Sequence, residues 1–194
     1  MTRAASQAAN RARLITTAEH LIAKESVPSI SLRKICAEAG LTQGAFYSNF
    51  ASKQELLLEV MERHLEEQHR QLAELAVMLR DAEADQTFAV FMAWLQSAGE
   101  KREWATLAIE LRLHAERDPA FGALMRLADA RTVVGFAGLL DELMHRLSLK
   151  SRLPVDALAE ALLSLWYASV LRRSGQGRPE TIVVEVLREM LVER

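Results

Sequence analysis

The sequence has a single cysteine, Cys36, among its 194 residues, so no disulfide can form within the chain. One cysteine is typical of a protein kept in a reducing compartment. Two long segments without a charged residue, 86–99 and 161–171, are shorter than the roughly 20 apolar residues that a membrane helix needs. The first 13 residues are polar and lack the apolar core of a secretory signal. These absences predict a cytoplasmic protein with no membrane partner.

Proline and glycine are also scarce, with four and eight residues respectively. Most of them fall in a few short segments, such as 40–44 and 175–179, and between these breaks the apolar residues recur at intervals of three and four. Such spacing is typical of amphipathic helices, and no run alternates as a strand would, so we predict an all-α fold of about nine helices. We expect the helices at about 7–25, 32–38, 43–49, 53–81, 86–100, 102–116, 119–147, 155–173 and 179–193.

Three of the expected helix starts have a local cause in the sequence. Ser52 followed by Glu55 forms a capping box, in which the hydroxyl and the carboxylate each accept a hydrogen bond from a free backbone N–H. Asp118 precedes Pro119, which places a cap before a proline at the first helical position. Pro179 begins the last helix in the same way.

Charge and helix length both divide the chain near residue 53. Residues 1–54 contain seven Lys and Arg against three Asp and Glu, a net charge of +4, whereas the remaining 140 residues carry 17 basic and 23 acidic side chains, a net charge of −6. A basic head on an acidic body suggests that only the head meets a polyanion. The expected helices are short or medium before residue 53 and mostly long after it, so we predict a domain boundary there.

The segment 31–50 combines two short helices with a tight turn. The first helix has one apolar stripe at residues 32, 35, 36 and 39, Gly40 supplies the backbone freedom for the turn, and Thr42 is a good N-cap for the second helix. Two short helices joined by a turn of three or four residues that contains glycine form a helix-turn-helix. Such pairs also occur as simple packing units, so the pattern alone leaves both interpretations open.

The outward face of the second helix carries hydrogen-bonding side chains and no carboxylate. In a major groove, Gln43 would reach a base edge, while Thr42 and Tyr47 would contact phosphate. Lys53 lies at the N-terminus of the next helix, where its charge adds to that of the helix dipole. Arg33, at the start of the first motif helix, has the same opportunity.

Five short motifs follow one another near the N-terminus: SLRKI at 31–35, AGLTQG at 39–44, FY at 46–47, NF at 49–50 and SKQEL at 52–56. Through them, residues 11–57 resemble the DNA-binding head of the tetracycline-repressor (TetR) family. The resemblance implies an N-terminal three-helix helix-turn-helix domain, which we place at 1–53, followed by a helical ligand-binding and dimerisation domain at 54–194. The chain departs from the family at 26–30, where the usual Gly-aromatic turn is absent.

The resemblance also assigns roles to single residues. In the family, the residues that match Tyr47 and Lys53 contact phosphates, and those that match Thr42, Gln43 and Ala45 face bases. Asn49 stands where the family often has histidine. The predicted DNA-binding residues are Ser31, Arg33, Thr42, Gln43, Gly44, Ala45, Tyr47, Ser48, Asn49 and Lys53.

The last two expected helices are candidates for a dimer interface. Twelve of the 15 residues at 157–171 are apolar, and a helix that is apolar nearly all round is buried on every side. The TetR family dimerises through its last two long helices, although a purely intramolecular core would also explain the pattern. A homodimer would present two heads to a palindromic operator. The predicted interface residues are Leu158, Leu162, Leu165, Trp166, Ser169, Val183, Val186, Leu187 and Met190.

Large apolar side chains recur along the middle helices at helical spacing. Such residues can form a simple core, but the family usually encloses an apolar pocket among these helices, and aromatic and methionine side chains would line one. Glu110 and His114 could give that pocket a polar anchor, or they could face solvent or satisfy each other. The predicted pocket residues are Phe88, Phe91, Met92, Trp94, Trp104, Leu107, Glu110, His114, Met125, Phe136 and Trp166.

An enzyme is a different class of function, and its signals are missing. The five histidines show no metal-ligand spacing, no phosphate-binding or dinucleotide-binding glycine motif occurs, and Cys36 lies on an apolar stripe. We therefore predict no enzyme, no metal and no cofactor. A helical protein-interaction module that has lost DNA binding is a further alternative.

Together these observations predict a repressor whose partners are double-stranded operator DNA, a second copy of the chain and a small apolar or amphipathic effector. In this hypothesis the effector moves the helix that begins at Lys53 and lowers operator affinity, which requires it to bind the two states differently. A ligand-responsive activator and an effector-independent regulator of the same fold are the alternatives.

Overall fold

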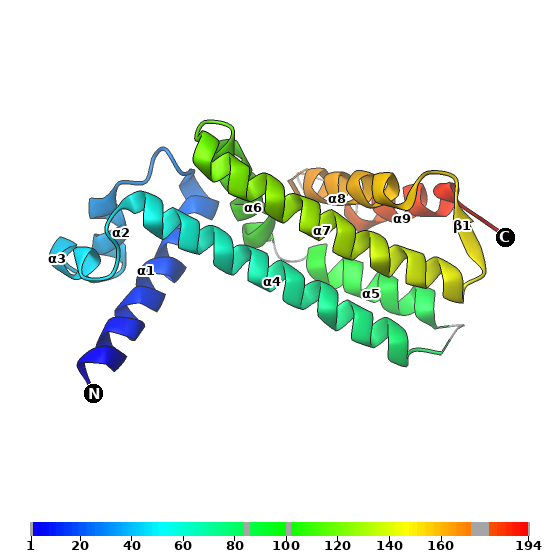
Figure 1. Ribbon diagram of the computed structural model, residues 1–194, viewed down its shortest axis with the longest axis horizontal. Helices are drawn as coiled ribbons and strands as arrows, with labels where there is room; N and C mark the ends of the chain where they lie inside the picture. The colour runs from blue at the N-terminus through cyan, green and yellow to red at the C-terminus, as the bar shows by residue number, and fades with distance from the viewer. Residues whose placement is uncertain (1, 84–85, 100–101, 172–178, 194) are drawn as a thin grey trace. The chain divides into compact units, whose positions relative to one another are not determined.

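The computed structural model describes residues 2–83, 86–99, 102–171 and 179–193 (Figure 1). The regular structure of these residues consists of helices and two short strands, which confirms the all-α fold class. In chain order they are α1 (Arg3–Glu25), α2 (Leu32–Glu38), α3 (Gln43–Tyr47), α4 (Lys53–Asp81), α5 (Thr87–Gly99), α6 (Arg102–Ala115), α7 (Pro119–Arg146), β1 (Leu149–Ser151), α8 (Val155–Leu171), α9 (Pro179–Met190) and β2 (Leu191–Glu193).

The expected helix starts at residues 53, 119 and 179 are confirmed, and the first two have the predicted caps. The Ser52 hydroxyl accepts a hydrogen bond from the backbone N–H of Glu55 at 3.1 Å, and the Glu55 carboxylate accepts one from the N–H of Ala51 at 2.6 Å. At the start of α7, Asp118 Oδ1 accepts from the N–H of Phe121 at 3.0 Å. The caps define where the long helices begin.

Some helix ends lie two to four residues from their expected approximate positions. We expected α1 to begin at residue 7, but Thr2 accepts a hydrogen bond from the N–H of Ala5 at 3.3 Å and caps a helix that begins at Arg3. Residues 4–9 are all exposed, so they lack the apolar spacing on which the sequence argument depends. The recognition helix α3 ends at Tyr47, two residues before the expected end.

The sequence shows no alternating run typical of a strand, but the structure contains two short strands, β1 and β2. β1 and β2 pair antiparallel, with Leu149 opposite Glu193 and Ser151 opposite Leu191, so the last helix ends at Met190. The backbone N–H of Arg152 extends the pairing by donating to Met190 O at 2.9 Å. Strands of three residues are too short to show alternation in a sequence, and backbone hydrogen bonds hold them.

The chain divides into two compact units, and each has its own apolar core. The first unit contains the described residues of 1–66 and 106–125, and the second contains those of 67–105 and 126–194. The first unit therefore holds α1, α2 and α3 with the beginning of α4, most of α6 and the beginning of α7. The functional boundary between residues 53 and 54 stays a prediction. The largest fully buried side chains of the first unit are Leu14, Ile22, Ile35, Phe46, Phe50, Leu56, Leu111 and Phe121.

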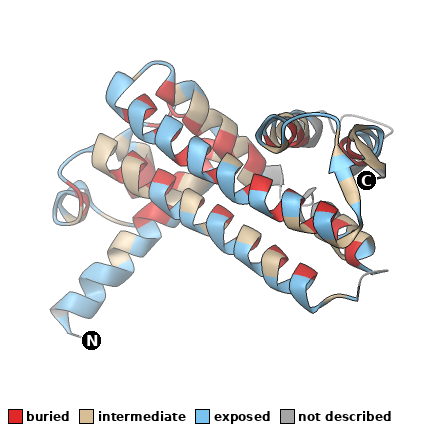
Figure 2. Cartoon of the chain, turned by 45° about the vertical axis from the view of Figure 1, so that its right-hand side comes forward, coloured by how far each residue is buried: buried red, intermediate tan, exposed pale blue. Residues whose placement is uncertain are grey.

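The second unit contains α5, α8, α9 and both strands, together with the later parts of α4 and α7 and the first residues of α6. α8 and α5 both pack against α9, and fully buried side chains such as Leu75, Phe91 and Leu140 lie in its core. Buried residues recur along one side of each long helix, α4 and α7 (Figure 2). Within the described residues, no helix is both long and apolar enough to span a bilayer.

Candidate nucleic-acid interface and pocket

The turn between α2 and α3 is fixed by backbone geometry. Gly40 has a φ of +62°, in the left-handed region that side chains disfavour, and a Cβ at this position would lie 3.0 Å from Arg13 Nη2. Arg13 donates to Ala39 O at 2.5 Å, and the N–H of Leu41 donates to Cys36 O at 2.9 Å. These contacts set the angle at which α3 leaves the turn.

The inner side of α3 is anchored by two rings. Phe46 and Phe50 are fully buried, and their ring centroids lie 5.6 Å apart. Ile35 and Cys36 of α2 are buried in the same cluster. Burial raises the pKa of the Cys36 thiol, so this side chain stays protonated and acts as core, in keeping with its place on the predicted apolar stripe.

The outer side of α3 is polar and accessible. Gln43, Gly44 and Tyr47 are exposed, and 60% of the Tyr47 surface faces solvent. Thr42 is the predicted N-cap, because its hydroxyl accepts from the N–H of Ala45 at 3.1 Å. The Ser48 hydroxyl donates to Gly44 O at 3.0 Å, which leaves its lone pairs for another donor. Residues 39–50 contain no carboxylate that would repel phosphate.

The two basic side chains at the start of α2 differ in their surroundings. Arg33 is exposed and makes no hydrogen bond or ion pair with the described part of the chain. Lys34 is paired with Glu25, with Nζ 2.5 Å from the carboxylate. Ser31 is the N-cap of α2 and accepts from the N–H of Lys34 at 3.2 Å. Arg33 is therefore free to meet a phosphate, while Lys34 already has an anion.

Lys53 has a structural task that the sequence did not reveal. Its ammonium donates to Val27 O at 2.9 Å and to Ile30 O at 2.5 Å, and it thereby fastens the loop between α1 and α2 to the start of α4. The side chain is half-buried, and desolvation lowers its pKa. An ammonium has three donors, so one N–H remains for a phosphate.

Asn49, a predicted DNA contact, has its side chain turned toward the protein in this structure. Its side-chain amide donates to Ala45 O at 2.7 Å, and its Oδ1 is buried without a hydrogen-bond partner, so the side chain turns inward. The neighbouring Arg11, which the sequence analysis did not select, donates to Asn49 O at 2.6 Å and pairs with Glu59 at 2.7 Å. Its guanidinium lies 4.2 Å from the Phe50 ring centroid. Arg11 therefore holds the end of α3 in place.

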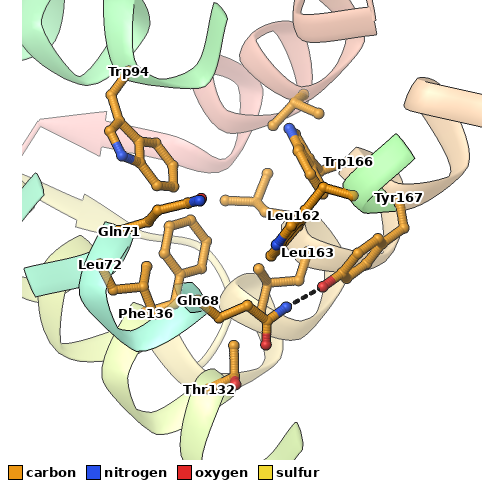
Figure 3. A pocket seen from close by; sticks show the side chains of 12 residues that line it. Gln68, Gln71, Leu72, Trp94, Thr132, Phe136, Leu162, Leu163, Trp166 and Tyr167 are labelled. Atoms are coloured by element: carbon orange, nitrogen blue, oxygen red, sulfur yellow. Dashed lines mark hydrogen bonds between the residues drawn. The ribbon is translucent and has the colours of Figure 1, made fainter. Parts of the chain in front are cut away.

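The second unit contains a pocket with a largely apolar lining (Figure 3). Its empty volume, including the open mouth, is about 530 Å³. Every helix of the unit, from α4 to α9, contributes at least one side chain. The lining residues are Gln68, Gln71, Leu72, Trp94, Trp104, Thr132, Phe136, Leu162, Leu163, Trp166, Tyr167 and Val183.

Three aromatic rings form one wall of this pocket. The centroid of Trp104 lies 5.6 Å from that of Trp166, edge to face, and 6.3 Å from that of Tyr167, stacked. Trp166 and Tyr167 are in contact at 5.0 Å. Trp94 of α5 faces this wall from the other side of the pocket (Figure 3).

The polar groups of the pocket come from α4, α7 and α8. The Gln68 amide N–H donates to the Tyr167 hydroxyl, and Gln68 Oε1 is buried with no hydrogen-bond partner. Gln71 Nε2 donates to a carboxylate oxygen of Glu67 at 2.7 Å. The Thr132 hydroxyl donates its hydrogen to its own helix, to Ala128 O at 3.1 Å.

Only some of the predicted pocket residues line this pocket. Four of the eleven predicted residues line it, namely the aromatic side chains of residues 94, 104, 136 and 166. Phe88, Phe91 and Met92 belong to the same compact unit but are not among the lining residues. The sequence analysis missed Gln68 and Gln71, although both fall at helical spacing with the buried residues 75 and 79 of α4.

The remaining predicted pocket residues, Leu107, Glu110, His114 and Met125, lie in the first compact unit. Leu107 and Met125 are buried in its core. The His114 ring lies 4.9 Å from the Phe121 ring, and its Nε2 is buried without a hydrogen-bond partner. Desolvation lowers the His114 pKa, which favours the neutral ring. Leu107, His114 and Met125 therefore pack within that unit, where Glu110 is partly exposed.

Burial within the single chain also reduces the number of predicted interface residues that could contact a second copy. Leu158, Leu162, Val183 and Leu187 are at most 1% exposed within a single chain, so they have no surface left for a partner. They are buried because α8 and α9 pack against each other. Trp166 is likewise buried and lines the pocket, whereas Leu165, Val186 and Met190 keep some exposed surface, and the side chain of Ser169 lies outside the described residues.

No cluster of three or more His, Cys, Asp or Glu side chains suited to a metal ion occurs in the described segments. The polar face of α3 and the pocket are thus the two candidate sites. The first can donate and accept hydrogen bonds along a groove, and the second can enclose a small molecule.

The sequence likeness to known proteins is concentrated in the α2–α3 region. A family model described as bacterial regulatory proteins, tetR family, matches residues 14–60, which include the whole helix-turn-helix. The HTH-type transcriptional regulator YerO of Bacillus subtilis (strain 168) is 38% identical over 53 residues. That match spans 27% of this chain and 18% of YerO, so the chain covers less than a fifth of that relative's length.

Solved structures resemble the chain over nearly its whole length. A TetR-family transcriptional regulator from Agrobacterium tumefaciens has a TM-score of 0.79 at 15% identity and covers 96% of this chain and 100% of its own. A transcriptional regulator from Saccharomonospora viridis, solved in complex with choline, has a TM-score of 0.76 at 21% identity and covers 95% of this chain and 98% of its own. At these identities the likeness establishes the fold.

Proposed function

We propose that this chain, a member of the TetR family of bacterial regulatory proteins through its residues 14–60, represses transcription as a homodimer on a palindromic operator and leaves the DNA when a small effector binds. Its family makes it a DNA-binding transcription regulator. The observation that carries the proposal is the exposed, acid-free face of α3, supported from behind by the buried Phe46 and Phe50. A regulator of this kind would act in the cytoplasm, on the nucleoid.

On the operator, α3 enters the major groove. Gln43 and Ala45 face base edges, and Tyr47 contacts phosphate. Arg33 supplies a free cation beside the groove, and Lys53 offers its remaining N–H. The other proposed contacts, Ser31, Thr42, Gly44 and Ser48, lie at the exposed ends and surface of the motif.

The dimer forms through the sides of α8 and α9 that the single chain leaves partly open. On α9, Ile182, Val186 and Met190 follow one another at intervals of four and form a stripe, and Ile182 is 45% exposed. Leu165 of α8 has surface to join this stripe. Two copies joined here would present two recognition helices related by a twofold axis, and a palindrome has the same symmetry.

The effector is a small apolar or amphipathic molecule in the pocket of the second unit. The regulator from Saccharomonospora viridis, which shares the fold, was solved with a small molecule bound. Helix α4 includes Lys53 of the first unit and Gln68 and Gln71 of the second. A ligand that contacts these glutamines differently in the two states would shift α4 and lower operator affinity.

The DNA-binding proposal is tested by fluorescence anisotropy with a labelled duplex from the DNA upstream of the chain's own gene. The wild-type chain should bind with an affinity that falls steeply with salt. Tyr47→Ala should weaken binding by about a hundredfold, because it removes a hydrogen bond to a charged phosphate in each of the two subunits, at about 1.5 kcal/mol each.

Val77→Ala is the matched control. Val77 is 52% exposed on α4, belongs to none of the proposed sites, and should leave the affinity unchanged. A wild-type chain that ignores every duplex at low salt would contradict the proposal and leave a helical interaction module as the function. Equal binding by the wild type and Tyr47→Ala would contradict the docking of α3.

A further inference from the structure

The side chains that line the pocket of the second unit favour one chemical class of ligand. We infer that it binds an organic cation of the quaternary ammonium class that carries one hydrogen-bond donor. This inference rests on the proposed function only for the idea that the pocket receives the effector. It narrows the effector from apolar or amphipathic molecules in general to positively charged ones.

The first support is the arrangement of aromatic faces. Trp104 and Tyr167 stack against each other with an interplanar angle of 12°, and the Trp166 ring meets both at steep angles, 69° and 75°. Trp94 of α5 lies across the pocket from Trp166 and Tyr167 (Figure 3), and with Trp104 and Phe136 the lining rings come from four helices. The face of an aromatic ring is electron-rich and attracts a cation within about 6 Å, most strongly for tryptophan.

The second support is the pair of side-chain oxygens in the lining. Gln68 Oε1 is buried and has no hydrogen-bond partner, although a buried acceptor normally has one. The Thr132 hydroxyl gives its hydrogen to Ala128 O, so only its lone pairs are left for a ligand. Both oxygens would accept a hydrogen bond from a ligand hydroxyl or N–H, and their partial negative charge favours a nearby cation.

The third support is the absence of charged side chains from the pocket lining. None of the lining residues is Lys, Arg, Asp or Glu. An anion would therefore enter without a counter-charge, which is costly in a buried site. A primary ammonium or a metal ion would lose strong hydration with no carboxylate to replace it. A quaternary ammonium is weakly hydrated, and ring faces can take the place of its water shell.

The test compares two ligands of equal shape and different charge. Choline and its neutral carbon isostere, 3,3-dimethyl-1-butanol, are titrated into the full chain by isothermal calorimetry, with tetramethylammonium as a cation that has no donor. Choline should bind at least tenfold more tightly than the isostere. It should also bind more tightly than tetramethylammonium, because its hydroxyl can donate to Gln68 Oε1.

Variants at Trp104 separate the charge effect from simple packing. Trp104→Leu should weaken choline at least fivefold and leave the isostere unchanged, and Trp104→Phe should lie between the wild type and Trp104→Leu. Val134→Ala, an exposed change on α7 outside the lining, is the matched control. Circular dichroism checks folding, and Trp94→Leu replaces Trp104→Leu if that variant unfolds.

Two results would overturn the inference: equal affinities for choline and the isostere, or no binding of either. Anisotropy with the operator duplex on the same samples distinguishes this failure from that of the proposed function. A chain that binds the duplex but shows no preference for choline contradicts the ligand class alone. A chain that prefers choline but ignores DNA contradicts the repressor and leaves the pocket assigned.

Discussion

Most of the positive charge around α3 is already committed to the protein itself. Lys34 pairs with Glu25, Arg11 pairs with Glu59, and Lys53 donates to two loop carbonyls. Arg33 is exposed and makes no such contact with the described residues. The sequence showed that this end of the chain is basic, but each side chain's partner follows only from the fold.

Arg33 and Lys34 are neighbouring basic residues with different surroundings, so substituting each one tests how much its charge contributes to operator affinity. Arg33→Ala should weaken operator binding at all sequences and reduce the slope of log affinity against log salt by about 1 for each subunit bound, because one phosphate contact is lost. Lys34→Ala should change the slope much less, since Glu25 already neutralises that ammonium. The measurement is anisotropy over a series of salt concentrations. An unchanged slope for Arg33→Ala would remove this residue from the interface.

At the scale of helices and strands, local sequence signals predicted where a helix begins better than they predicted which segments pair or pack together. The capping box at Ser52 and Glu55 and the Asp118 cap gave the beginnings of α4 and α7, because these hydrogen bonds involve residues close in sequence. The β1–β2 pair joins segments about 40 residues apart through backbone atoms. Because backbone atoms make this pairing, no pattern of side chains in the sequence predicts it.

The helix-turn-helix depends on one backbone position. Gly40→Ala should lower the free energy of unfolding by about 1–2 kcal/mol, because a side chain disfavours the left-handed region and the new Cβ would press on Arg13. Operator affinity should fall as well, because Gly40 sets the direction of α3. Urea unfolding and anisotropy measure the two effects.

Gly138→Ala in α7 is the control for the Gly40 substitution. A Cβ there has no neighbour within 4 Å, and alanine favours a helix interior over glycine by about 1 kcal/mol. This variant should be as stable as the wild type or more so. A Gly40→Ala variant with unchanged stability would show that the turn can adopt another geometry.

For the molecule as a whole, apolar patterns identified buried helices without saying what buries them. Leu158 and Leu187 were expected to meet a second copy, yet each is fully covered within its own chain. The pocket shows the same limit. Its tryptophans were predicted from their chemistry, whereas Gln68 and Gln71 were missed because polar residues inside a long amphipathic helix are usually solvated. Only the arrangement of several helices places them in a cavity.

The dimer proposal leads to a charge-insertion test. Ile182→Glu should raise the dimer dissociation constant at least tenfold, because a carboxylate on the α9 stripe would be buried without a partner. Sedimentation velocity measures the effect, and operator binding should weaken with it.

Val134→Glu is the control, since Val134 is also an exposed apolar residue, at 69%, but lies on α7. It should leave the dimer intact. A dimer that tolerates Ile182→Glu and dissociates with Val134→Glu would move the interface from α9 to α7.

The short β1–β2 pair makes a closed ring of the chain between Leu149 and Glu193. α8 and α9 both lie inside this ring, and they supply five of the twelve residues around the pocket. Backbone hydrogen bonds between the strands therefore tie the segment just before α8 to the end of α9. A change confined to the strand pair would remove this tie without altering a residue in either helix.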